Sequence, residues 1–188
     1  MKSDQEDIHW VSRVIQGDTD AFGLLVNKYK DMVFTLALRM IHQREEAEEV
    51  AQDVFLKIFK ALPKFQQKAK FSTWMYRIAY NECISRLRRK KNTVVSIENL
   101  PGNAVRSLAT EDEDWQDDEM RSRILHSALK RLPEADQGLV HLYYFDNLPV
   151  EEMAHVTGLS VSNVKIKLFR IRKKLFDELV PVKNALQI

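Results

Sequence analysis

The stretch TGLSVSNVKIKLFRIRKK, Thr157 to Lys174, mixes large apolar residues with six lysines and arginines and contains no acid. Its large apolar residues Val164, Leu168 and Ile171, together with Leu175 just after it, are spaced by four, three and four residues. Such spacing places the four side chains on one face of a helix. The stretch therefore predicts an amphipathic helix, about residues 161 to 179, with one apolar face and one cationic face.

The residues just before this helix predict a tight turn. Gly158 allows the positive φ of a sharp helix exit, and Ser160 can cap the helix that follows. A shorter helix, about residues 149 to 156, precedes the turn, and Ala154 is small enough to let two helices cross closely. Two helices joined in this way predict a helix-turn-helix.

The exposed set near the start of the second helix is polar or cationic apart from one isoleucine, as expected for contacts to base edges and phosphates in a major groove. It consists of Ser162, Asn163, Lys165, Ile166, Lys167 and Arg170. Three cations that follow, Arg172, Lys173 and Lys174, would meet the flanking backbone. The alternative is a solvated basic face on a bundle helix.

Composition indicates an all-α protein. The chain has 188 residues, 45% of them hydrophobic, with only five glycines and five prolines. This length suits one large domain or two small ones, and two fit the sequence better. A polar, acidic N-terminus and the lack of a long apolar run predict a cytoplasmic protein. Because Cys83 is the only cysteine, an internal disulfide and a multi-cysteine zinc site are excluded.

The net charge of +2 conceals strong sorting of charge along the chain. Residues 64 to 91 hold nine basic residues and the single acid Glu82, whereas residues 111 to 119 hold seven acids and no base. Such sorting predicts at least two kinds of partner, one polyanionic and one basic.

The helical pattern divides the chain into two parts. Helices are expected at about 4–16, 20–41, 44–61 and 71–91, with Asp20 capping the second, and again from about residue 118. Residues 92–117 lack periodicity, contain Pro101 and Gly102, and predict an acidic linker. The expected domains are 1–91 and 118–188, the second a four-helix domain with the helix-turn-helix.

The segment FQQKAKFSTWMYRIAYNECISRLRRKK, residues 65 to 91, interleaves aromatic and basic side chains. Aromatic rings stack on unpaired bases while cations follow the phosphates, so the pattern is typical of single-strand binding. The alternative is that Phe71 and Trp74 belong to the core, and periodicity favours the core for Trp74. Tyr76, Arg77 and Asn81 are better candidates for exposed contacts.

An acidic face accompanies the apolar stripe of the third helix, where Val50, Val54, Ile58 and Leu62 repeat every four residues. Glu45, Glu49, Gln52 and Asp53 make up this face. A charged helix face is usually only solvated, so this interpretation and a protein-binding role both remain open.

Three stretches together resemble an extracytoplasmic-function sigma factor of bacterial RNA polymerase, of the minimal two-domain kind. AEEVAQDVFLKIFKALPKF resembles the family's polymerase-binding and promoter-recognition helix, and FSTWMYRIAYNECISRLRRKK resembles its promoter-melting segment. LPEADQGLVHLYYFDNLPVEEMAHVTGLSVSNVKIKLFRIRKKL resembles the domain that reads the -35 element. The resemblance covers about residues 18 to 179.

The resemblance implies a non-enzymatic protein that binds core RNA polymerase and promoter DNA, duplex at -35 and single strand at -10. It needs no cofactor and no metal, and an anti-sigma factor is an implied partner. The implied polymerase-binding residues are Glu49, Gln52, Asp53 and Leu56. The implied -35 contacts are Ser162, Asn163, Lys165, Lys167, Arg170 and Lys173. The implied -10 and melting contacts are Lys64, Phe65, Lys70, Ser72, Thr73, Tyr76, Arg77, Asn81, Arg88 and Arg89.

Two departures from the family pattern stand out. Pro149 occupies a position where the family often has a capping Ser or Thr, and the loop FQQKAKFS lacks the family's frequent Gly. The sequence therefore does not predict which base the loop prefers.

Two other classes of function require different features of the sequence. A stand-alone helix-turn-helix regulator, with an N-terminal sensor or dimerisation domain, would bind duplex without polymerase, usually as a dimer on a palindrome. An enzyme has little support, because the five histidines are scattered without metal-ligand spacing and no phosphate-binding loop or nucleophile motif is present.

Overall fold

The structure, a computed structural model, describes the backbone of residues 2–98 and 117–185 and the side chains of residues 4–90 and 124–180. These described residues form helices and no strand, which confirms the all-α prediction. Most of the expected linker, including the acids from Glu111 to Asp114, lies outside the described residues.

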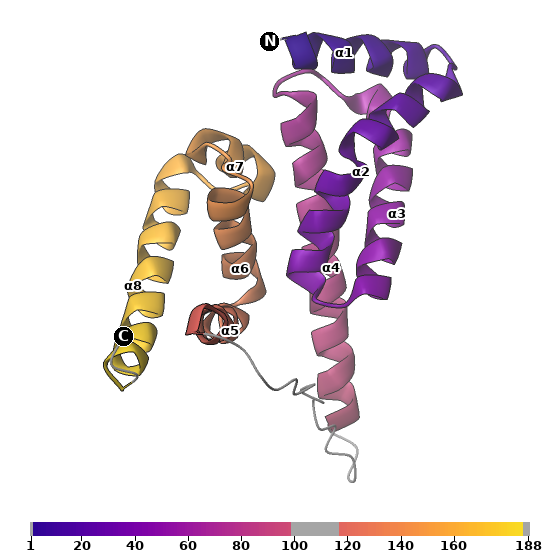
Figure 1. Ribbon diagram of the computed structural model, residues 1–188. Coiled ribbons are helices and arrows are strands. Elements are labelled where there is room, and N and C mark those ends of the chain that lie inside the picture. Colours follow the sequence, from indigo (N-terminus) through magenta and orange to yellow (C-terminus); the bar gives the residue numbers. More distant parts are fainter. Residues whose placement is uncertain (1, 99–116, 186–188) are drawn as a thin grey trace.

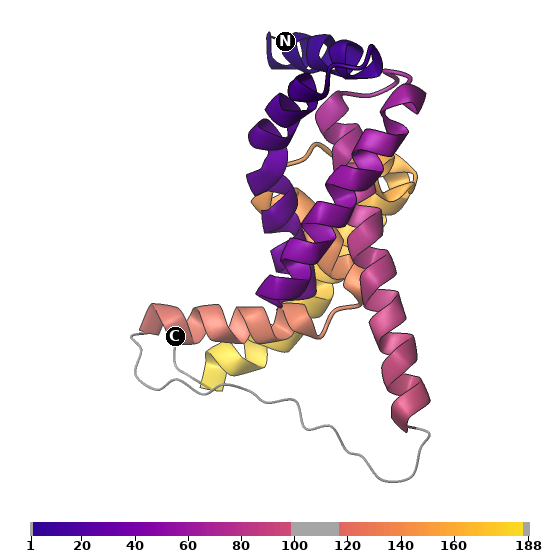
Figure 2. The ribbon, with the colours of Figure 1, turned by 90° about the vertical axis from the view of Figure 1, so that its right-hand side faces the viewer.

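The N-terminal unit consists of four helices and a short 3-10 turn (Figure 1). The elements are α1 (Lys2–Ile15), α2 (Thr19–Ile41), α3 (Arg44–Ala61), η1 (Leu62–Lys64) and α4 (Phe71–Glu98). Helices α2, α3 and α4 pack side by side, and α1 lies across one end of them. Helix α4 continues to Glu98, past the end expected at residue 91, and projects beyond α2 and α3 (Figure 2).

The start of α2 corrects one expectation. The cap is Asp18 and not Asp20: the Asp18 carboxylate accepts hydrogen bonds from the backbone N–H groups of Asp20 and Ala21, at 3.0 and 3.2 Å. An N-cap carboxylate accepts from the second and third residues of the helix, and Thr19 is the first. Asp20 therefore lies inside the first turn, where its charge still favours the helix dipole.

The core of the N-terminal unit contains the apolar stripe that the sequence predicts. Val50, Val54, Ile58 and Leu62 are all at most 1% exposed. They pack with Val33 and Leu36 of α2 and with Met75 and Cys83 of α4 in one buried cluster. Because a thiol loses its hydration when buried, the pKa of Cys83 is raised to about 12, and the side chain packs as a small hydrophobe.

The C-terminal unit is the expected four-helix domain with one irregularity. Its elements are α5 (Asp117–Lys130), α6 (Glu134–Val140), η2 (His141–Phe145), α7 (Val150–Thr157) and α8 (Val161–Ala185). The segment η2 is a π-type turn that follows directly on α6. Val164, Leu168 and Ile171 of α8 are buried against Met153 and Val156 of α7.

The two units pack against each other in the part of the chain that the structure describes. Helix α7 and helix α6 contact α4, and α6 also contacts α2. Figure 1 shows α7 and α6 on the side of α4, with α8 on the far side of them. This arrangement places the start of α4 opposite α7.

Candidate nucleic-acid and protein interfaces

The helix-turn-helix forms as the sequence predicts. Gly158 ends α7 with a φ of 74°, and its N–H donates to the carbonyl of Ala154 at 3.0 Å. The Ser160 hydroxyl accepts a hydrogen bond from the N–H of Asn163 at 3.2 Å, which caps α8. Pro149 precedes α7 without a side-chain cap, as the missing hydroxyl at this position predicts.

The cationic face of α8 is exposed, with one exception. Ser162, Asn163, Lys165, Arg170 and Lys173 all lie on the surface. Lys167 is only partly exposed, because its Nζ donates to Asp136 of α6 at 3.0 Å. Lys167 therefore lies toward α6 and not at the centre of the exposed face.

Two apolar residues complete the exposed face of α8. Ile166 and Phe169 are 47% and 66% exposed, on the side opposite the buried Val164 and Leu168. The expected site did not include Phe169, although its spacing of three from Ile166 and seven from Ser162 was a sufficient signal. Apolar side chains on such a helix suit the methyl groups of thymines in a major groove.

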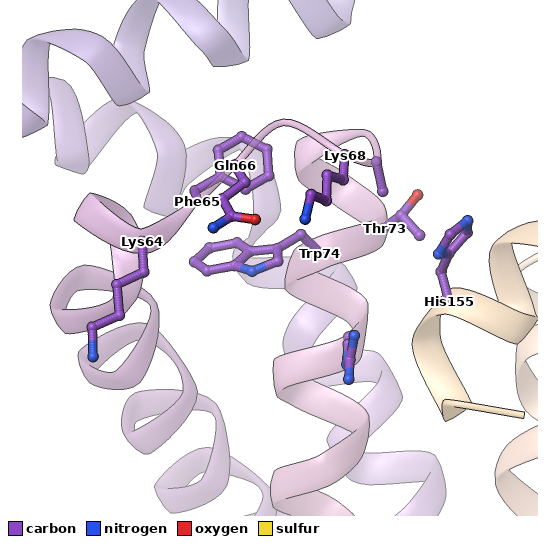
Figure 3. Close-up of a pocket in the computed structure, with 9 residues that line it drawn as sticks. Lys64, Phe65, Gln66, Lys68, Thr73, Trp74 and His155 are labelled. Atoms are coloured by element: carbon purple, nitrogen blue, oxygen red, sulfur yellow. The ribbon is translucent and has the colours of Figure 1, made fainter.

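The loop before α4 forms a pocket of about 290 Å³, here called the loop pocket (Figure 3). It is lined by Lys64, Phe65, Gln66, Lys68, Ala69, Thr73, Trp74, Arg77 and His155. The rings of Phe65 and Trp74 have centroids 5.0 Å apart, and both contact the ring of the buried Phe71. Trp74 packs against the core, as its periodicity favours, and keeps part of its surface in the pocket.

One side of the loop pocket is bounded by α7. His155 approaches from α7, across from Trp74 (Figure 3). Beside it, the two carboxylate oxygens of Glu152 accept hydrogen bonds from Lys70 Nζ and Thr73 Oγ1, each at 2.7 Å. Partial burial by itself would raise the pKa of Glu152, but the bonds from Lys70 and Thr73 hold that pKa below its usual value. Thr73, expected to meet DNA, is 2% exposed.

The other residues expected to contact the -10 element are spread along α4. Arg77, Asn81 and Arg88 are exposed, and Ser72 is partly exposed. Arg89 pairs with the buried Glu82 at 3.3 Å. Tyr76 is only partly exposed, and its burial raises its pKa.

On the acidic face of α3, some residues are exposed and others pair with basic residues of α4. Gln52, Asp53 and Leu56 are exposed, Leu56 to 59%. Glu49 instead pairs with Arg86 of α4.

Glu46, which the sequence interpretation missed, is another residue of α3 that pairs with α4. It accepts from Arg86 at 3.2 Å and from Lys90 at 2.9 Å. Apart from the exposed Glu45 in the first turn, the residues open to a partner lie from Gln52 onward, toward the exposed Phe59.

Two negative findings concern the described residues only. None of their helices is long and apolar enough to cross a membrane. Among the same residues, no three His, Cys, Asp or Glu side chains come together as metal ligands.

Both units of the chain match known protein families. The profile of Sigma-70 region 2 matches residues 25–93, and that of Sigma-70, region 4 matches residues 122–175. The RNA polymerase sigma-H factor of Pseudomonas aeruginosa is 32% identical, over 97% of this chain and 98% of its own. The ECF RNA polymerase sigma factor SigW of Bacillus subtilis is 31% identical, over 90% of this chain and 94% of its own.

Two solved structures share the fold. CnrH, in complex with the cytosolic domain of CnrY, has a TM-score of 0.66 at 23% identity and covers 93% of this chain and 97% of its own. The sigma factor RpoE of Bartonella quintana, in complex with the anti-sigma factor NepR, has a TM-score of 0.64 at 18% identity. It covers 84% of this chain and 96% of its own. With both region profiles and two full-length relatives matched, the chain belongs to the extracytoplasmic-function group of sigma-70 factors, which serve transcription initiation by bacterial RNA polymerase.

Proposed function

We propose that α8 reads the -35 duplex, that the loop pocket and the exposed side of α4 hold the separated -10 strand, and that α3 binds core polymerase. The observation that supports the proposal is the presence of two surfaces of different design. One is a capped cationic helix, and the other is a pocket that combines rings with cations. The two surfaces suit duplex and single strand respectively.

On the duplex, the first turns of α8 would enter the major groove. Ser162, Asn163 and Arg170 can reach base edges, while Lys165 and Lys173 can reach phosphates. Lys167 can contribute once its bond to Asp136 is exchanged for a phosphate or a base. Each well-placed bidentate base contact discriminates by about 1–3 kcal/mol.

On the separated strand, the loop pocket supplies both parts of a single-strand site. Phe65 and Trp74 offer ring surface, and Lys64, Lys68 and Arg77 offer positive charge. Stacking on an aromatic ring contributes about 1–3 kcal/mol per base, which offsets part of the cost of separating the strands. Arg88, Arg89 and Asn81 would follow the phosphates farther along α4.

The protein partners follow from the charge of α3 and from the solved relatives. Gln52, Asp53 and Leu56 make an exposed acidic and apolar face that fits a basic surface of core polymerase. Because a similarly folded sigma factor was solved with an anti-sigma factor, an inhibitor of that class is a further proposed partner. The role uses binding energy alone, so it requires no catalytic residue.

The domain division is part of the proposal. Residues 1–91 would carry polymerase binding and -10 recognition, and residues 118–188 would carry -35 recognition. Residues 92–117 would connect them.

Transcription reconstituted with core polymerase tests the proposal. On promoters identified by mapping transcript starts after induced expression, Arg170→Ala should lower the preference for the native -35 sequence over a scrambled one. The expected loss is roughly 5- to 150-fold, from the free energy of one base contact. Lys130→Ala, which removes an exposed cation from α5 outside the recognition face, is the control and should retain the preference.

Two results would contradict the proposal. One is an unchanged -35 preference in Arg170→Ala. The other is tight, sequence-specific duplex binding by the isolated protein in a gel-shift assay, which would instead support the stand-alone regulator.

A further inference from the structure

A second pocket, of about 400 Å³ and here called the histidine pocket, lies where the end of α2 meets α5, α6 and η2. It is lined, among others, by Arg39, His42, His126, Leu129, His141 and Phe145. We propose that the histidine pocket binds a small organic phosphate, a molecule with one phosphoryl group and an apolar body. None of the lining residues belongs to the proposed DNA or polymerase surfaces, so this site goes beyond the proposed function and does not rest on it.

The polar lining of the histidine pocket is basic. Arg39 and His42 line it from the end of α2, His126 lines it from α5, and no described lining residue is acidic. Figure 2 shows the end of α2 close to α5, and the rings of His42 and His126 have centroids 5.6 Å apart. A concave site that gathers basic groups from several elements and contains no acid favours an anion.

The protein itself neutralises only part of this positive charge. Arg39 pairs with one acid, Asp146, at 3.4 Å, and a guanidinium has further N–H groups to donate. Partial burial, and next the charges of Lys130 and His42, lower the pKa of His126. A phosphoryl group would bring negative charge to these residues, and its oxygens match the N–H groups of a guanidinium.

His141 supplies a buried polar atom to the histidine pocket. Its residue is 7% exposed, and its Nδ1 has no hydrogen-bond partner among the described residues. A buried polar atom without a partner costs free energy, so its presence requires a reason. A phosphoryl oxygen that accepts from Nδ1 would supply that reason. The π-type turn that carries His141 agrees with a binding role, because such turns are frequent at functional sites.

The rest of the lining sets the size and the apolar character of the ligand. Leu38, Leu129 and Phe145 are apolar, and the Arg39 guanidinium lies 4.6 Å from the ring centroid of Phe145. Basic and apolar groups therefore adjoin each other. The volume falls within the range of small-molecule sites, roughly 300–1,000 Å³, and exceeds what a bare phosphate fills. The body of an organic phosphate would cover the three apolar side chains.

A metal ion is the other ligand that a group of histidines suggests. Among the described residues, no three His, Cys, Asp or Glu side chains come together as metal ligands. The guanidinium of Arg39 in the same pocket would also repel a cation. The histidine pocket therefore favours an anion.

Binding of phenyl phosphate to the free, full-length protein tests the proposal. Isothermal titration calorimetry measures the Kd, and the Tm should rise with phenyl phosphate concentration, because a ligand of the folded state stabilises it. Inorganic phosphate lacks the apolar body and phenol lacks the phosphoryl group. Each should therefore bind more weakly than phenyl phosphate.

Two variants with matched controls locate the binding. His126→Gln removes an exposed imidazole and should weaken phenyl phosphate binding by about two- to tenfold, as for the loss of one hydrogen bond. His9→Gln, in α1, is its control. Arg39→Gln should weaken binding by about 10- to 100-fold, since it removes a charged donor. Arg13→Gln is its control, because it also breaks one ion pair, with Asp18 at 2.6 Å, at the other end of α2.

Affinity that falls in both variants and in neither control supports the site. Undetectable binding of phenyl phosphate would overturn it, as would equal affinities of wild type, His126→Gln and Arg39→Gln, which would place the phosphate elsewhere on the protein. Equal affinities for phenyl phosphate and inorganic phosphate would overturn the role of the apolar lining. Tight Zn²⁺ binding that His126→Gln abolishes, without phosphate binding, would identify a metal site instead. The transcription assay of the proposed function is independent of all these results.

Discussion

At the scale of single residues, two acids of equal charge on α3 differ in whether a partner can reach them. Glu49 and Asp53 lie one helical turn apart on α3, yet Glu49 is paired with Arg86 and Asp53 is exposed. An exposed ion pair contributes little to stability, whereas an unpaired acid remains available to a partner. Asp53 is therefore the sharper test of polymerase binding.

Asp53→Lys should weaken binding to core polymerase by about tenfold, because it reverses a charge opposite a basic surface. Fluorescence anisotropy of labelled protein titrated with core polymerase measures the change, and circular dichroism checks that the fold is intact. Glu48→Lys, an exposed position on another side of the same helix, is the control. Equal affinities for Asp53→Lys and wild type would leave the acidic face as a solvated surface only.

At the scale of elements, the π-type turn η2 buries a histidine that the sequence did not single out. His141 is 7% exposed, and its Nδ1 has no hydrogen-bond partner among the described residues. Burial, and next the nearby charge of Arg39, lower the pKa of His141 to about 4. The folded protein thus disfavours the imidazolium form.

Stability should fall as the pH falls from about 6.5 toward 4. In this window the unfolded chain binds a proton at His141 that the folded chain does not, whereas above 6.5 neither form binds it. The expected loss at pH 5 relative to pH 7.5 is about 2 kcal/mol from this group. Urea unfolding at the two pH values measures it.

His141→Gln should flatten the pH dependence, because glutamine does not titrate in this range. His9→Gln, which removes an exposed imidazole from α1, is the control. If His141→Gln and wild type lost equal stability between pH 7.5 and pH 5, His141 would not be the cause.

At the scale of the whole molecule, the contact between the two units should hold them together after the chain that joins them has been cut. A protease site inserted within residues 99–116 allows the connection to be cut in the native protein. The two fragments of the cut protein should co-elute in size-exclusion chromatography, held by the contacts at Gly138, Glu152 and Arg39. Fragments carrying Gly138→Ala should separate, while those carrying Gly23→Ala should not.

Immediate separation of the cut wild-type fragments would contradict this expectation. It would mean that the chain connection, and not the interface, keeps the units together.

The sequence by itself determined the family and the helices, except for the end of α4 and the π-type turn η2. Periodic apolar residues, a positive-φ glycine and a capping serine act over one or two turns, so local pattern was enough to predict α3, the turn at Gly158 and the exposed face of α8. Only the tertiary structure decided which of the predicted contacts are free. Thr73 is buried against Glu152, Lys167 is bonded to Asp136, and Glu49 is paired with Arg86, because each partner lies far away in the sequence and close in space. The need for a glycine at residue 138 was likewise invisible, since it comes from the ring of Tyr80 on the other unit.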